Sequence, residues 1–296
     1  MPSQPAPGHS APGRTVASPH AVSPASVRLG TQGWNYDAWV GAFYPSGTRP
    51  ADYLGVYARA FDTVEVDSTF YAVPAVKTVR GWAERTPSGF RFALKLPQEV
   101  THEHRLRAGG DDVARRFFDV ARELGDKLGP VLVQCGPDFS PDELPALVRF
   151  LPTLPTDIAV CVEFRQRAWM SEGVLNLLAE HGVGLALSDG RWVPRRWMLQ
   201  LAERLAERPA GAVGYVRWMG PNRDLVDYSR IQVDRSRELE AWGAALRRLA
   251  GGVRTVYGYV NNHFAGHSPQ NVRDLQRLLG QPVVAPDQLG EQLGFL

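Results

Sequence analysis

The sequence predicts an α/β fold, a (β/α)8 barrel of the triosephosphate-isomerase (TIM) type in a single domain. Eight short apolar runs alternate with amphipathic helical segments from residue 27 onward, which is the pattern of a parallel barrel. The main alternative is an open doubly wound sheet, which typically has a glycine-rich first turn. Neither G-x-G-x-x-G nor G-x-x-x-x-G-K-[S/T] occurs in the chain, so the closed barrel is favoured.

We expect the strands at the apolar runs that lie between helical patterns. They are Val27–Thr31, Thr63–Asp67, Phe90–Leu96, Val131–Cys135, Ile158–Glu163, Val183–Ser188, Val213–Trp218 and Val253–Val260. The helix after the third run is the clearest, because Asp111 and Asp112 give it an acidic first turn. Its apolar face carries Val113, Phe117 and Val120, at the spacing of one side of a helix.

The first 26 residues differ in composition from the rest of the chain. They are rich in Pro, Ala, Ser and Gly and have almost no large apolar side chains, so burial cannot offset the entropy of ordering them. This composition predicts a disordered tail over residues 1–26 and a barrel domain over residues 27–296. We expect a cytoplasmic protein with no membrane partner, because no apolar run reaches the ~18 residues of a spanning helix. Cys135 and Cys161 lie in apolar runs and are expected to be free thiols.

The charge composition limits the classes of partner. The chain has 33 basic and 31 acidic residues and a net charge of +2, so at most weak binding of nucleic acid is expected. Only Lys77, Lys95 and Lys127 among the basic residues are lysines. A lysine inside a strand, as predicted for Lys95, indicates a requirement for a compact ammonium group.

Polar residues end the predicted strands, where barrels of this type build their functional sites. They are Thr31, Glu65, Lys95, Gln134, Glu163, Asp189, Arg217 and Asn261. A buried charge needs a partner or a solvated pocket, because its desolvation is costly. Two interpretations remain open: these residues form a functional site, or they form an ion-pair network that closes the top of the barrel.

Several segments of the chain resemble the YecE-like family, also called domain of unknown function 72. They include Gly30–Tyr36 (GTQGWNY), Glu65–Tyr71 (EVDSTFY), Phe92–Pro97 (FALKLP), Glu163–Arg165 (EFR), Tyr215–Arg217 (YVR) and Tyr259–His263 (YVNNH). The resemblance runs in order from Arg28 onward and implies a TIM-type barrel, but no established reaction.

Three positions depart from the pattern of that family. Asp67 replaces a usual asparagine, Cys135-Gly136 replaces a common Pro-Pro pair, and Met219 replaces a frequent histidine. Asp67 and Met219 fall at the expected mouth of the barrel, so details of ligand contact are expected to differ there.

Our leading hypothesis is an enzyme that acts on a small anionic or phosphorylated ligand, a class that includes nucleotide-derived compounds. Lys95, Arg165 and Arg217 hold the anion, and Glu65 and Glu163 serve as acid and base, with Lys95 also catalytic. Aromatic rings beside these cations suit a base or sugar ring with an attached phosphate. The further ligand-binding candidates are Trp34, Tyr36, Asp67, Tyr71, His102, Gln134, Trp169, Asp189, Asn261, Asn262 and His263.

Two alternatives come from other functional classes. One is a non-catalytic module that binds a ligand or nucleic acid in the same pocket. The other is a metal-dependent phosphoesterase with an architecture similar to endonuclease-type barrels. Its candidate metal ligands are Glu65, His102, Glu163, Asp189 and His263. No cofactor is expected, a divalent metal belongs only to this last alternative, and the oligomeric state is left open.

Two geometric expectations follow from the barrel. Glu65 and Lys95 lie at the ends of neighbouring strands and are expected to face each other, close enough for an ion pair or a water bridge. A phosphate is expected between the loops after the seventh and eighth strands, because barrels often bind phosphate there at the start of a helix. The residues expected to hold it are Arg217, Gly220, Asn261, Asn262, His263, Gly266 and Ser268.

Overall fold

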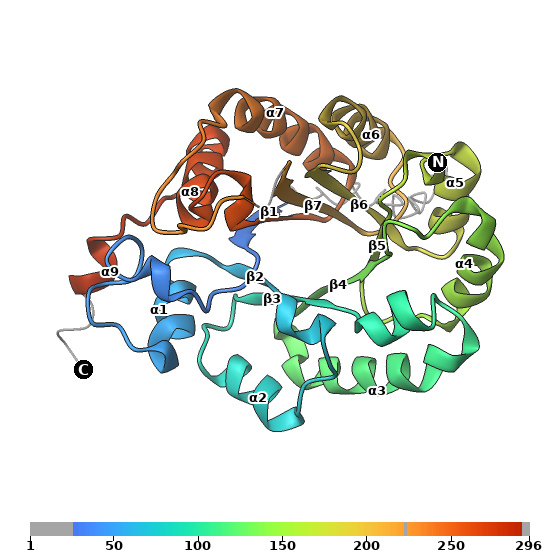
Figure 1. Cartoon of the computed structure of the whole chain (residues 1–296), viewed down its shortest axis with the longest axis horizontal. Helices are drawn as coiled ribbons and strands as arrows, with labels where there is room; N and C mark the ends of the chain where they lie inside the picture. Colours follow the sequence, from blue (N-terminus) through green and yellow to red (C-terminus); the bar gives the residue numbers. More distant parts are fainter. Residues whose placement is uncertain (1–25, 222–223, 292–296) are drawn as a thin grey trace, which may run out of the picture.

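A computed structural model describes residues 26–221 and 224–291 and shows strands surrounded by helices (Figure 1). Each strand is followed by a helix that packs on the outside of the sheet. The strands are β1 (Ser26–Thr31), β2 (Thr63–Val66), β3 (Arg91–Lys95), β4 (Leu128–Gln134), β5 (Val160–Glu163), β6 (Gly184–Gly190), β7 (Val213–Gly220) and β8 (Thr255–Val260).

The strands form a nearly closed parallel barrel in the order β1-β8-β7-β6-β5-β4-β3-β2. Between the two ends of this order, Gln32 forms a parallel bridge with Glu65. The Gly33 N–H also donates to the Glu65 carbonyl oxygen at 2.8 Å. The predicted (β/α)8 barrel of TIM type is therefore confirmed.

The strand boundaries agree with the sequence to within a few residues. The largest differences at the carboxyl ends are in β6 and β7, which extend two residues further than predicted, to Gly190 and Gly220. The predicted disordered tail lies outside the described residues except for Ser26, which is the first residue of β1 and pairs with Thr255 of β8.

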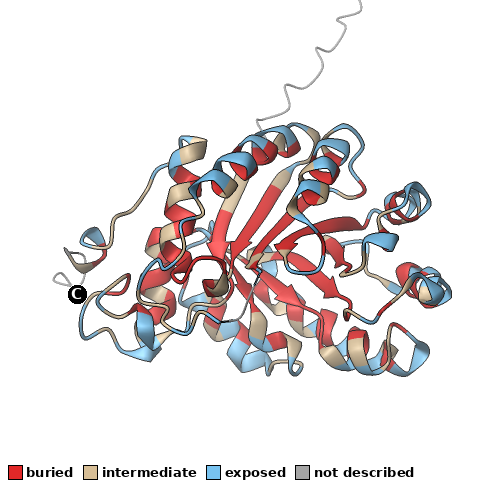
Figure 2. Ribbon diagram, turned by 45° about the horizontal axis from the view of Figure 1, so that its top comes forward, coloured by how far each residue is buried: buried red, intermediate tan, exposed pale blue. Residues whose placement is uncertain are grey.

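The helices bury the residues that face the barrel and expose those on the opposite side (Figure 2). They are α1 (Tyr53–Ala60), α2 (Val76–Glu84), α3 (Asp111–Ala121), α4 (Leu144–Phe150), α5 (Glu172–Glu180), α6 (Arg195–Glu207), α7 (Ser236–Gly252), α8 (Ser268–Leu279) and α9 (Gln288–Glu291). In α3, the predicted Val113 and Phe117 are buried, whereas Val120 is half-buried. Ser171 caps α5 by accepting from the Val174 N–H at 3.4 Å.

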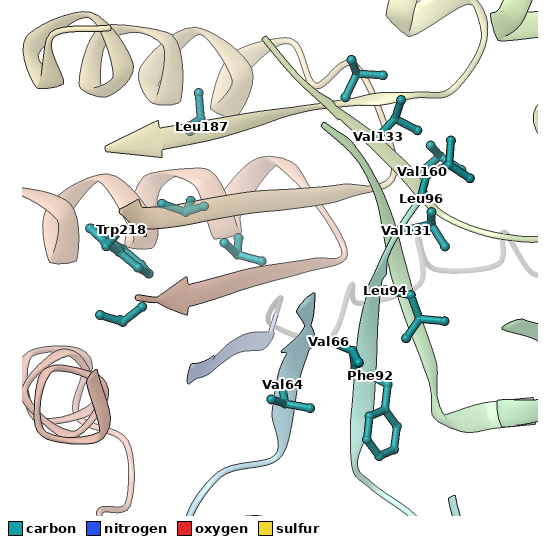
Figure 3. Close-up of a cluster of buried hydrophobic side chains, with 14 of the residues drawn as sticks. Val64, Val66, Phe92, Leu94, Leu96, Val131, Val133, Val160, Leu187 and Trp218 are labelled. Carbon is teal, nitrogen blue, oxygen red and sulfur yellow. The ribbon is translucent and has the colours of Figure 1, made fainter. Parts of the chain in front are cut away.

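The pleat of the strands divides the core into two layers. Side chains such as Leu94, Val131 and Leu187 belong to the larger layer, between the sheet and the helices (Figure 3). A smaller cluster fills the barrel interior, consisting of Ala93, Leu132, Cys161, Ala186, Tyr215, Tyr257 and Tyr259. Because side chains alternate along a strand, residues two positions beyond this cluster also point inward. They are Lys95, Gln134, Glu163, Ser188, Arg217 and Asn261.

Both cysteines are free and buried, as predicted. Cys161 lies inside the barrel and Cys135 in the outer layer. Over residues 26–221 and 224–291, none of the helices has the length and apolar character needed to cross a membrane.

Candidate functional site

A cavity of about 380 Å³ lies at the carboxyl ends of the strands. This volume falls in the range of small-molecule sites, which is about 300–1,000 Å³. Each strand contributes at least one side chain to the wall, from near its carboxyl end or just beyond it. From β1 to β8 these are Gln32, Asp67, Lys95, Gln134, Glu163, Ser188, Arg217 and Asn261, and β7 also contributes Met219.

Arg217 of β7 forms the floor of the cavity and is only 1% exposed. Its Nε and Nη2 donate to the two carboxylate oxygens of Glu65, at 2.9 and 2.7 Å. Its Nη1 donates to Gln134 Oε1 at 3.0 Å and to Glu163 Oε2 at 2.7 Å. Such a bidentate, charge-assisted network fixes a guanidinium rigidly. Its donors are therefore engaged by the protein, whereas the sequence predicted that Arg217 would hold the ligand's anion.

Glu65 is fully buried beneath Arg217 and does not line the cavity. Besides the Arg217 contacts, its Oε2 accepts from the Tyr215 hydroxyl at 2.6 Å. Burial raises the pKa of Glu65, while Arg217 opposes this shift. Both carboxylate oxygens are already bonded to donors, so Glu65 orients Arg217 and is not placed for the acid–base contact with ligand that the sequence predicted.

Glu163 is the buried carboxylate that does line the cavity. Its Oε2 accepts from Arg217, and its Oε1 lies 3.5 Å from Arg165 Nε. Burial acts to raise the pKa of Glu163, but Arg217 and Arg165 outweigh it, and the pKa lies below its ordinary value. The side chain is therefore a carboxylate near neutral pH.

Lys95 reaches the cavity from the end of β3, with its side chain 9% exposed. Its Nζ lies 3.3 Å from Asp67 Oδ1 and 4.3 Å from the ring centroid of Phe70. The predicted direct ion pair between Lys95 and Glu65 does not form, because Lys95 pairs with Asp67 and Glu65 pairs with Arg217. In the β2–β3 register Glu65 pairs with Ala93, which lies two residues before Lys95 on β3. Asp67 lies two residues after Glu65, so its carboxylate is the one beside the Lys95 ammonium.

His102 lines the cavity from an unusual turn after β3. It lies in a π-helical segment, η4 (Glu99–Glu103), which is followed by two residues with positive φ, Arg105 at 48° and Leu106 at 59°. Arg105 anchors this turn through Asp138, at 2.5 Å, and Glu143. Positive φ at non-glycine residues is strained and persists only where surrounding contacts hold it in place. Such backbone is found most often at functional sites.

The environment of His102 lowers the pKa of its imidazole. Burial is the largest cause, followed by the positive charges of Arg165 and Lys95. The Nδ1 atom lies 2.8 Å from the Thr101 hydroxyl oxygen, which orients the ring. His102 is therefore a neutral imidazole at the cavity wall near neutral pH.

Two of the strand-end predictions are wrong because of the pleat. Asp189 lies outside the barrel, where its Oδ2 accepts from Arg195 Nε at 2.5 Å and from Trp242 Nε1 at 2.7 Å. Its neighbour Ser188 occupies the inward position and lines the cavity. Thr31 also faces outward, where its side chain contacts the Tyr57 hydroxyl of α1. The next residue, Gln32, lines the cavity instead. A regular alternation with the interior residue Ala186 would have assigned Ser188 correctly.

Most of the aromatic candidates pack in the structure instead of lining the cavity. Trp169 is fully buried between the stacked rings of Phe139 and Phe164. Trp34 packs edge-on against Trp82, with ring centroids 5.8 Å apart. Aromatic residues at strand ends therefore mostly complete the hydrophobic core here.

Tyr36 also lies away from the cavity wall, and its hydroxyl donates to the Gln32 carbonyl oxygen at 2.9 Å. Tyr71 is the predicted aromatic that lines the cavity. The sequence interpretation missed Phe70, Arg191 and Trp192, which also line it. Arg191 and Trp192 could have been predicted, because they lie in the loop after the sixth strand, just beyond Ser188-Asp189.

The predicted phosphate site between the last two βα loops is not assembled as expected. Asn262 is buried, and its Oδ1 accepts from the Ser268 N–H at 3.0 Å, so the start of α8 is satisfied within the protein. Asn261 and His263 do line the cavity. Asn261 Nδ2 donates to Gln32 Oε1 at 2.8 Å, and His263 Nε2 lies 3.2 Å from the Tyr228 hydroxyl oxygen.

The five candidate metal ligands do not converge. Glu65 is covered by Arg217, and Asp189 lies outside the barrel, while His102, Glu163 and His263 remain at the cavity. Among the described residues, no group of three or more His, Cys, Asp or Glu side chains is arranged to hold a metal ion.

Comparisons with known proteins agree with this architecture. The family described as "Protein of unknown function DUF72" matches residues 28–292. The UPF0759 protein YecE of Escherichia coli K12 is 33% identical over 244 residues, which cover 80% of this chain and 86% of the relative. The UPF0759 protein YunF of Bacillus subtilis is 25% identical, covering 86% and 94%.

Solved structures of similar proteins show the same fold. A DUF72 family protein from Thermotoga maritima superposes with a TM-score of 0.68 at 23% identity, covering 86% of this chain and all of that one. A second DUF72 family protein, from Enterococcus faecalis, has a TM-score of 0.66 at 18% identity, covering 87% and 99%.

Proposed function

This chain belongs to the DUF72 family, and from the chemistry of its own cavity we propose that it is an enzyme acting on a small anionic or phosphorylated ligand. One observation carries the proposal: the wall has four cations, contributed by Lys95, Arg165, Arg191 and Arg217, and two carboxylates, Asp67 and Glu163. The buried Glu65 balances Arg217 from below, so the cations still outnumber the carboxylates by one. Positive charge in excess inside a partly desolvated cavity attracts anions more strongly than the same charges in open water.

The anion is held by Lys95 and Arg165. Arg217 is committed to Glu65, Gln134 and Glu163 and acts as a fixed floor. Lys95 has three donors, and its described ion pair with Asp67 is 3.3 Å long, so an incoming anion can be bound by the remaining N–H groups. Nucleotide-derived compounds fall within this ligand class.

Proton transfer is the role of Glu163 and His102. Glu163 lines the cavity as a carboxylate, so it is placed to accept a proton from the ligand or from water. Its lowered pKa keeps it ionised and makes it a weaker base than an ordinary glutamate. The lowered pKa of His102 keeps its imidazole neutral, able to accept or donate a proton at the same cavity. Lys95 then stabilises negative charge that develops on the ligand, and Glu65 acts through Arg217.

Binding of inorganic phosphate, measured by calorimetry, tests the site. We expect phosphate to bind the unaltered protein, and Lys95→Met to weaken it at least tenfold. The matched control is Lys77→Met, because Lys77 is an exposed lysine on α2 and lies outside the cavity. Equal phosphate affinity in the Lys95 and Lys77 variants contradicts the proposal.

A panel of phosphate monoesters, assayed for phosphate release, tests the catalytic part. Glu163→Gln should lower the rate by roughly 10²–10⁴, the usual contribution of a general acid or base. The same variant should retain phosphate binding, because Lys95 and Arg165 are intact. Turnover that is unchanged in Glu163→Gln rules out this residue as the proton acceptor.

A further inference from the structure

Two aromatic side chains are exposed at the cavity. In the described part of the chain, seven large hydrophobic side chains are exposed, and the aromatic ones among them are Tyr71, at 73%, and Trp192, at 42%. Both line the cavity. Aromatic side chains are usually buried in a soluble protein. Two exposed rings in the same cavity therefore indicate a surface that a ligand can cover.

The barrel topology places these two rings on opposite sides of the mouth. Tyr71 directly follows η3 (Asp67–Phe70), after β2, and Trp192 lies just beyond β6. In the strand order, three strands separate β2 from β6 in either direction. A ligand that spans the cavity therefore passes between them.

Trp192 lies directly beside cations of the cavity, and Tyr71 is connected to Lys95 through the ring of Phe70. The ring centroids of Tyr71 and Phe70 are 5.5 Å apart, and Lys95 Nζ lies over Phe70. On the other side, the guanidinium carbons of Arg165 and Arg191 lie 5.6 and 4.4 Å from the Trp192 ring centroid. Flat, π-rich surfaces and positive charge thus alternate around the mouth.

The volume of the cavity exceeds the requirement of a simple anion. At about 30 Å³ per water in the liquid, 380 Å³ corresponds to roughly a dozen waters. Phosphate alone leaves most of this space, including the two aromatic walls, in contact with water. The unused aromatic surface matches a second, uncharged part of the ligand.

We propose that the ligand is a phosphate or carboxylate that carries a flat unsaturated ring, with the ring stacked on Trp192 and contacting Tyr71. The anionic group lies on Lys95 and Arg165. This inference rests on the proposed function, because it uses the same cations, and it adds the chemical class of the remainder of the ligand.

Calorimetric titration with two matched pairs of compounds tests the ring. The pairs are adenosine 5′-monophosphate with ribose 5-phosphate, and phenyl phosphate with methyl phosphate. We expect at least one aromatic member to bind about tenfold more tightly than its partner, in line with the effect of stacking a single base. In Trp192→Ala this advantage should disappear, while the affinity for inorganic phosphate stays within twofold.

Trp197→Ala is the matched control. Trp197 lies on α6, also has an arginine over its ring, with the Arg167 guanidinium carbon 3.5 Å from the centroid, and does not line the cavity. This variant should keep the aromatic advantage in full.

The outcomes separate the two proposals. If inorganic phosphate does not bind, the proposed function fails and the ring inference with it. If phosphate binds but neither aromatic compound exceeds its partner, the ring inference alone is overturned. An equal loss of phosphate and aromatic affinity in Trp192→Ala also overturns it, because Trp192 then acts only by supporting Arg165 and Arg191.

Discussion

The floor and the rim of the cavity are built on different physical principles. The floor, defined as Glu65, Gln134, Glu163, Tyr215 and Arg217, is at most 4% exposed, and its charges are bonded to one another. The rim, defined as Tyr71, Lys95, Arg165, Arg191 and Trp192, includes exposed rings and cations beside open space.

This difference shows that a charged side chain at a strand end can either stabilise the fold through ion pairs or remain available to bind a ligand. A buried network is strongly coupled, and removing one member leaves another charge without a partner. A charge at the rim can be solvated when its partner is lost, so its removal changes binding more than stability. The comparison predicts how variants of the two regions divide between folding and binding.

The largest effect is expected at the floor. Arg217→Met leaves Glu65 buried without its cation and leaves Glu163 with only its longer pair to Arg165, which should destabilise the fold by about 3–5 kcal/mol. The fall in the free energy of unfolding is measured by chemical denaturation. The double variant Glu65→Gln/Arg217→Met should recover part of that loss, because one uncompensated charge is gone. Wild-type stability in Arg217→Met would show that the floor is not a coupled network.

The next effect is expected at Lys95, whose role is at the rim. Arg165→Met and Lys95→Met should each weaken phosphate binding about 10–100-fold, equivalent to roughly 1.4–2.8 kcal/mol. In Lys95→Met the unfolding free energy should change by less than about 1 kcal/mol, since the Asp67 side chain is 35% exposed and can be solvated. In Arg165→Met, Glu163 is buried but keeps its ion pair with Arg217. If Lys95→Met lost several kcal/mol of unfolding free energy and bound phosphate with unchanged affinity, Lys95 would be a structural residue and not a ligand-binding one.

His102 should respond to the anion with a shift in its pKa. The folded protein lowers the pKa of His102, so the unfolded chain takes up this proton at a higher pH than the folded protein does. The free energy of unfolding therefore falls as the pH drops from the ordinary pKa of histidine toward the lowered pKa of the folded state. A bound phosphate favours the imidazolium and should raise the pKa of His102 again. Ring resonances followed by NMR between about pH 4 and 8, with and without phosphate, measure the shift.

The exposed His181, beyond α5, is the control for this titration, because it lies outside the cavity. Its resonances should be unmoved by phosphate. If His102 titrates identically in both buffers, the anion does not lie near the imidazole.

The smallest effect concerns stability at the outer rim. Tyr71→Ser removes a ring that is 73% exposed, so the unfolding free energy should stay within about 0.5 kcal/mol of the unaltered protein. Trp169→Leu, in contrast, alters a fully buried stacked ring and should be clearly destabilising. Denaturant midpoints of the two variants measure the contrast. A large loss in Tyr71→Ser would indicate a structural role for the rim aromatics.

Much of the candidate site was predictable because strand ends are recognisable in sequence. Lys95, Gln134, Glu163 and Asn261 follow apolar runs directly, and the parallel barrel brings them to one cavity. Asp189 was misplaced because an apolar run on a strand buried on both faces does not reveal which residues point inward. Trp169 was misplaced because a conspicuous aromatic residue beside a strand end is equally suited to packing.

The local sequence determined the alternation of strands and helices, the TIM-type barrel and the presence of polar groups at its carboxyl face. Hydrophobic periodicity carries that information, since it acts over a few neighbouring residues. Only the tertiary structure decided which charges pair. Arg217 bonds to Glu65, Gln134 and Glu163, which precede it by 152, 83 and 54 residues. Contacts over such separations depend on strand order, register and pleat, and these are set by the closure of the whole barrel.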